Sequence, residues 1–220
     1  MTGPMDLKLL ERDAFRRFYE DGLMDVFFGL MLVTMSVSAV VTDWLENEMA
    51  GTLGMLGISV VLVTLLIVAR RRLLRARLGE FRPGPERRRK ITATRLVLVG
   101  SVLVGVVAFA VAAIAYAGEV PLASIDVLLP LLWFINAVVV MGAMAFYLDV
   151  PRFAFYGIVF GIAMPLLVWP DVLWGISVPV WIAFGVPGAV IVIIGLSMFR
   201  RFLQRYPPLP SGEDLLDGRR

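Results

Sequence analysis

The charged and amide side chains that could do chemistry in this chain are few, and most of them flank long apolar stretches. Asp25 lies at the start of one such stretch, and Asn136 lies near the middle of another. A carboxylate there can take part in a proton or cation pathway, cap a helix or pair with an arginine. An amide there can bind a substrate or join two helices, and for Asn136 we favour the structural role. For Asp25 we favour the cap or ion-pair role, and its candidate partners are Arg16, Arg17 and Arg152.

Two further charged residues, Asp149 and Arg152, flank a proline in a very short connection between apolar stretches. We expect them to hold this turn against lipid headgroups. Asp149 also belongs to an acidic group with Glu20, Asp21 and Asp25 that could bind a divalent cation, because carboxylate oxygens suit such ions. The spacing of this group matches no catalytic motif, so its signal for an enzyme is weak.

The chain contains no histidine and no cysteine. This composition excludes a Ser-His-Asp triad, thiol nucleophiles, disulfides, cysteine-ligated zinc and iron–sulfur clusters. It also removes the usual haem ligand and the commonest general base near neutral pH. We therefore predict no catalytic residues, no metal site and no cofactor.

Eleven basic residues lie between Arg70 and Arg95. Such a run can bind nucleic acid, anionic lipid or a phosphorylated ligand, or it can simply orient the chain in a membrane. Only Phe81 lies among the arginines, which disfavours a surface that stacks bases, and we expect no nucleic-acid partner. We favour the orienting role and keep anionic headgroups as a candidate ligand. The candidate lipid-binding residues are Arg70, Arg71, Arg72, Arg87, Arg88, Arg89 and Lys90.

The elements that must position these residues follow from the composition. Of the 220 residues 59% are hydrophobic and 18% are charged, and the mean hydropathy is +0.84. A soluble chain has about 45–50% apolar and ~25% charged residues, so a multi-pass membrane protein is indicated. A span needs about 20 apolar residues, and no stretch alternates as a β-barrel strand would. The predicted all-α bundle has six spans, at about 22–42, 49–69, 96–118, 127–148, 153–170 and 177–199.

The charges of the connections predict the orientation. With six spans every lysine and arginine falls on one side. In the connections on the other side, the only charged residues are acidic. The positive-inside rule then places both termini in the cytoplasm and the bundle in the cytoplasmic (inner) membrane. We expect residues 1–21 to form an interfacial amphipathic helix, 22–200 the membrane domain with a basic loop at 70–95, and 201–220 a disordered tail.

Small residues recur at helical spacing in several spans. Gly51, Gly54 and Gly57 lie in the second, Ser101 and Gly105 in the third, and Gly157 and Gly161 in the fifth, while Gly185, Gly188 and Gly195 follow in the sixth. Such faces let helix backbones approach closely in a membrane. They can serve internal packing or a homo-oligomer, and the spacing alone does not separate the two.

Three functions remain open from the sequence. We favour a non-enzymatic membrane protein, an oligomerising or accessory scaffold subunit, whose partners are membrane lipids and another copy or another membrane protein. This preference rests on scarce intramembrane polar groups and abundant small residues. The alternative is a transporter or channel for a small solute or lipid, with Asn136 and Asp25 near its path. The third is a lipid-modifying enzyme of the inner leaflet that uses Glu20, Asp21 and Asp25.

Overall fold

The computed structural model describes residues 21–74, 84–114 and 122–206, and the regular structure in these ranges is entirely helical. Six of its helices are long and apolar enough to cross a membrane, which agrees with the predicted all-helical, multi-pass architecture. Two short π-helical segments, η1 and η3, adjoin them. The elements are α2 (Leu23–Leu45), α3 (Glu48–Ala69), η1 (Arg70–Leu74), α5 (Pro85–Ile114), α6 (Leu122–Leu148), α7 (Arg152–Trp174), η3 (Trp181–Gly185) and α8 (Val186–Arg205).

The ends of these helices follow from local chemistry. The side chain of Asn47 caps α3 by accepting a hydrogen bond of 3.1 Å from the amide of Ala50. Gly175, with φ 66°, ends α7 in the left-handed conformation that glycine adopts without steric cost. The third long helix already begins at Pro85, inside the expected basic loop. The predicted amphipathic helix of residues 1–20 and the tail from 207 onward lie outside the described residues.

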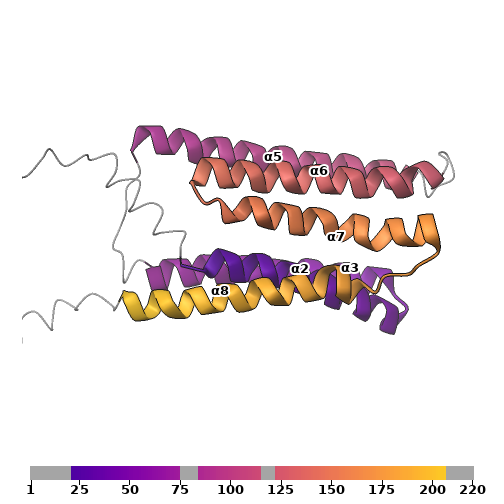
Figure 1. Cartoon of the computed structure of the whole chain (residues 1–220), viewed down its shortest axis with the longest axis horizontal. Coiled ribbons are helices and arrows are strands. Elements are labelled where there is room, and N and C mark those ends of the chain that lie inside the picture. Colours follow the sequence, from indigo (N-terminus) through magenta and orange to yellow (C-terminus); the bar gives the residue numbers. More distant parts are fainter. Residues whose placement is uncertain (1–20, 75–83, 115–121, 207–220) are drawn as a thin grey trace, which may run out of the picture.

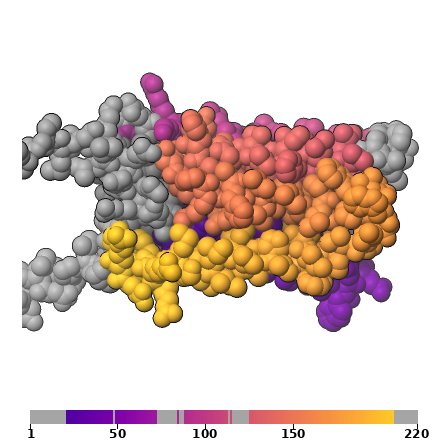
Figure 2. Space-filling model, in the orientation of Figure 1, coloured from indigo at the N-terminus to yellow at the C-terminus, as the bar shows by residue number. Residues whose placement is uncertain are grey.

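The helices form two groups of three (Figure 1). In one group α2 packs against both α3 and α8, and in the other α6 packs against both α5 and α7. The described chain begins and ends at the same end of the bundle, where the turn between α6 and α7 also lies. In the space-filling view only a narrow strip of α2 is visible, between α7 and α8 (Figure 2).

Glycines create two close helix contacts within these groups. Gly29 of α2 faces Gly188 of α8, and a Cβ added to Gly188 would lie 2.8 Å from the carbonyl oxygen of Gly29. Gly157 and Gly161 of α7 lie in the same way against α6, where a Cβ on Gly161 would meet the ring of Phe134 at 2.8 Å. Backbones approach this closely only where no side chain intervenes. These small-residue faces therefore serve internal packing.

Other small residues of the same sequence pattern face open space. A Cβ on Gly54 or Gly57 of α3, or on Gly100 or Gly105 of α5, would meet nothing within 4 Å among the described residues. The structure thus separates two classes of glycine that the sequence pattern leaves together. One class contacts a neighbouring helix, as Gly51 of α3 does against Thr42 of α2, and the other faces open space.

We predict that Gly188→Ala destabilises the protein by about 1–3 kcal/mol, because the new methyl group would press on the backbone of α2. Replacing glycine by alanine ordinarily stabilises a helix by ~1 kcal/mol. Here we expect the replacement to destabilise the protein, because packing outweighs helix propensity. Thermal unfolding in detergent measures the effect. Gly57→Ala is the matched control and should leave the unfolding temperature unchanged or slightly higher; equal effects of the two changes would contradict this packing.

Candidate functional site

A buried charge network joins α2 to α7 at the end of the bundle where the described chain begins. Arg152 places Nη2 3.0 Å from Oδ2 of Asp25, and the hydroxyl of Tyr156 donates to Oδ1 of the same carboxylate at 2.5 Å. The side chain of Asp25 is fully buried, and Tyr156 is nearly so. Arg152, one of the three candidate partners, thus forms an ion pair with Asp25, whereas Arg16 and Arg17 lie outside the described residues.

The sequence positions these partners through helical spacing. Arg152 and Tyr156 are four residues apart in the first turns of α7, so their side chains lie on one face of that helix. Asp25 lies in the first turn of α2, where the helix dipole also favours an anion. The helix cap itself is Gly22, with φ 77°, and it makes no side-chain cap bond. Asp25 is therefore an ion-pair residue and is not the cap.

Because Asp25 is buried, its charge must be compensated by contacts within the protein. A charge held in an apolar interior costs several kcal/mol unless a counter-charge and hydrogen bonds compensate it. Both oxygens of Asp25 have such a contact, one to the guanidinium and one to the tyrosine hydroxyl. Arg152 also places Nη1 3.5 Å from Sδ of Met198 on α8. Three helices consequently meet at one polar contact.

Aromatic rings enclose the network on one side. The ring of Phe28 lies 5.6 Å from that of Phe153 and 6.2 Å from that of Phe160, both edge to face, and 6.4 Å from that of Tyr156. Edge-to-face pairs of this kind add about 0.5–1.5 kcal/mol beyond area burial. Because Phe28 belongs to α2 and the other rings to α7, the cluster joins the two helix groups.

A second carboxylate, Asp21, is also fully buried just before α2. Its Oδ1 accepts a hydrogen bond of 3.1 Å from the amide of Leu23, and its Oδ2 has no hydrogen-bond partner in the part of the chain that the structure describes. Burial raises the pKa of Asp21 from 3.8 to about 6, although the positive charges of Arg70 and Arg152 and the Leu23 amide act in the opposite direction. The nearby Asp25 charge adds to the rise.

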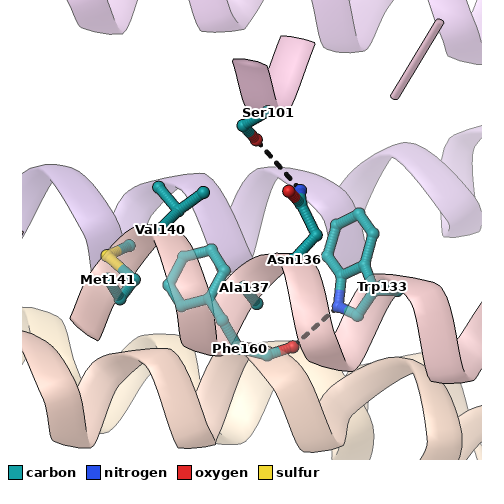
Figure 3. A pocket seen from close by; sticks show the side chains of 7 residues that line it. All are labelled: Ser101, Trp133, Asn136, Ala137, Val140, Met141 and Phe160. Atoms are coloured by element: carbon teal, nitrogen blue, oxygen red, sulfur yellow. Dashed lines mark hydrogen bonds between the residues drawn. The ribbon is translucent and has the colours of Figure 1, made fainter. Parts of the chain in front are cut away.

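Asn136 lies at a different place, between α5 and α6. Its Nδ2 donates to Oγ of Ser101 on α5 at 3.0 Å, and the Nε1 of Trp133 donates to the backbone oxygen of Phe160 on α7 at 2.8 Å (Figure 3). Both bonds join neighbouring helices. They border a cavity of about 140 Å³ whose other lining residues are the apolar Ala137, Val140 and Met141.

The two charged residues that flank the turn between α6 and α7 each contact another helix. Arg152 contacts the buried carboxylate of Asp25 and so supplies its counter-charge. Asp149, at φ 57°, lies 3.7 Å from Nζ of Lys90 on α5. This pair is partly exposed and connects the turn to the neighbouring helix.

The basic candidates for lipid binding are scattered over one end of the bundle. Arg71, Arg72, Arg88 and Arg89 are exposed, whereas Arg70 is half-buried. The side chain of Arg87 lies outside the described residues, as does Glu20 of the proposed acidic group. Among the described side chains no three acidic groups converge as a metal would need, so Asp25 and Asp149 serve separate ion pairs.

Sequence reasoning missed the role of Tyr156 and the full burial of Asp21. The four-residue spacing from Arg152 to Tyr156 is visible in the sequence, and it could have placed the hydroxyl beside the guanidinium. Nothing in the sequence shows that α7 rests on the first turn of α2. Comparisons of the chain with protein-family models, curated proteins and solved structures find no match.

We predict that Arg152→Met destabilises the protein by about 3–5 kcal/mol, because it leaves Asp25 charged and buried without its counter-charge. Tyr156→Phe should cost less, about 1.5–3 kcal/mol, since it removes one hydrogen bond to a charged group. Unfolding in detergent at neutral pH reports both.

Two further variants sharpen this measurement. Adding Asp25→Asn to Arg152→Met should recover part of the lost stability, because no charge then remains buried at this place. Lys90→Met removes the partly exposed pair with Asp149 and should cost less than about 1 kcal/mol. A loss for Lys90→Met as large as that for Arg152→Met would show that burial does not set the cost.

Proposed function

We propose that this protein is a non-enzymatic, multi-pass membrane protein that works as an oligomerising or accessory scaffold subunit of a membrane complex. The observation that carries the proposal is the pair of glycine-bearing outer helices. In the described part of the chain α3 packs chiefly on α2 and α5 on α6, and the most apolar window of each is unburied. Helix association in lipid depends on close backbone approach, which such glycines permit.

These two helices have features that lipid contact alone does not require. Bulky side chains suit contact with acyl chains, and α3 and α5 carry many, such as Val60 and Phe109. Gly54, Gly57 and Gly105 interrupt these surfaces with open space above their α-carbons. Each gap accepts a helix of a second copy, or of another membrane protein, at short interaxial distance.

The alternatives have weaker support. A transporter would use a polar path through the bundle, whereas the cavity at Asn136 is small and its lining is largely apolar. A lipid-modifying enzyme would use converging carboxylates at the interface, and among the described residues Asp25 is committed to Arg152 and Tyr156. Both observations favour the scaffold.

The proposed setting is the cytoplasmic membrane with both termini inside. The six candidate spans among the described residues support this orientation, as do the arginines where α3 ends and α5 begins. Arg71, Arg72 and Arg89 are exposed there, so anionic headgroups are their proposed ligands.

Cysteine labelling tests this orientation cleanly, because the chain has no cysteine of its own. A single cysteine at Ser177, in the exposed connection after α7, should react with a membrane-impermeant maleimide in intact cells. A cysteine at Arg201, exposed near the end of α8, should react only after permeabilisation. The opposite pattern would reverse the proposed topology.

Association is tested by substituting the open glycines. Gly57→Leu and Gly105→Leu should each weaken self-association at least tenfold, about 1.4 kcal/mol, by preventing close helix approach. Native mass spectrometry of the protein in nanodiscs measures the oligomer fraction and any co-purifying partner.

Val63→Leu is the matched control, because Val63 is also exposed on α3 but six residues from Gly57, on another side of the helix. It should leave association unchanged. A wild-type protein that is monomeric and without a partner would contradict the proposed function.

A further inference from the structure

The buried charges next to α2 do not balance within their immediate contacts. Asp21 and Asp25 are both fully buried, and Arg152 is the one cation that the structure places in direct contact with either carboxylate in the described residues. That contact is to Asp25, whose other oxygen holds the hydroxyl of Tyr156. Asp21 therefore has an oxygen, Oδ2, that is buried and lacks a hydrogen-bond partner among the described residues.

A buried carboxylate oxygen without a hydrogen-bond partner is costly in its charged form, and binding a proton or a metal cation removes that cost. A divalent metal takes six or more oxygen ligands, and Mg²⁺ and Ca²⁺ sites draw several of these from carboxylates. The described acidic side chains form no group of three, and the oxygens of Asp25 are occupied. A proton needs a single oxygen and no coordination shell. The geometry thus selects the smallest cation.

We propose that Asp21 is a proton-binding site, at which Oδ2 takes up one proton from water and changes how strongly the ends of α3 and α7 are held against α2. The product is a neutral carboxylic acid, and no other group changes its charge. This proposal does not depend on oligomerisation.

The groups that face Asp21 explain the consequence of protonation. Arg70 of η1 and Arg152 of α7 attract its negative form, Asp25 of α2 repels it, and the amide of Leu23 bonds to it. On the side of α8, a Cβ added to the neighbouring Gly22 would meet backbone atoms of Gly195 and Phe199. These backbone atoms carry no charge. When Asp21 is neutral, Arg70 and Arg152 each lose one electrostatic attraction toward the start of α2. The ionised form draws η1 and α7 toward the start of α2.

The sign of the pH dependence follows from burial. In the unfolded chain the carboxyl has its ordinary pKa of 3.8, and in the folded protein the pKa is about 6. The folded state therefore binds the proton more tightly, so ionisation of this group lowers stability as pH rises from about 4 to about 6. The full loss of stability is present above about pH 6, and none of it is present below about pH 4.

The test compares Asp21→Asn with the wild-type full chain in detergent, by thermal unfolding from pH 4.5 to 7.5. The variant cannot ionise, so its unfolding temperature should gain several degrees relative to the wild type as pH rises through the window. Asp43→Asn is the control, since Asp43 is exposed near the other end of α2. The difference in unfolding temperature between Asp43→Asn and the wild type should not change with pH. A difference between Asp21→Asn and wild type that is constant with pH would overturn the proposal.

Infrared difference spectra between pH 5 and pH 7.5 provide a direct readout. The wild type should show a protonated-carboxyl band at pH 5 that is absent from Asp21→Asn and retained in Asp43→Asn. If Asp21→Asn does not fold, Asp21→Glu keeps a carboxyl group and should show the band with a shifted midpoint. At constant ionic strength, a midpoint that moves when Na⁺ or K⁺ replaces a large organic cation would assign the site to a metal cation and overturn the proton assignment.

Discussion

The ionised carboxylate of Asp25, enclosed by apolar helices, is the constraint on which the rest of this structure depends. A charge in such surroundings must be paired and hydrogen-bonded, because water is not there to solvate it. Arg152 and Tyr156 meet this need from α7, four residues apart on one helix face. This requirement sets the position of α7 along the axis of α2. It therefore also sets the position of the short turn that precedes α7.

Around this contact the bundle uses two different kinds of helix interface. Within each group of three, glycines bring backbones together, as at Gly29 with Gly188 and at Gly157 with α6. Between the groups large side chains fill the space instead, with Phe28 set among the rings of α7. Close backbone packing resists rearrangement, whereas an interface of rings and one ion pair has fewer and more specific contacts.

The outer helices connect this architecture to the proposed role. α3 and α5 are the least enclosed of the six, and each carries glycines above which the described structure has open space. The buried ion pair lies between α2 and α7. In the proposed role, partners would dock on the outer helices α3 and α5, away from this pair.

The sequence by itself determined the helical, multi-pass architecture, because apolar stretches of about 20 residues and the scarcity of charge have no other stable arrangement. It also predicted an arginine partner for Asp25 and left Arg16, Arg17 and Arg152 as the candidates. Only the tertiary structure decided that Tyr156 completes the pair, that Asn136 bonds to Ser101, and that Asp21 is buried with one oxygen unpartnered. It likewise decided which glycines face inward. Helical periodicity reports the face of a residue on its own helix, whereas the neighbour of that face depends on how all the helices pack.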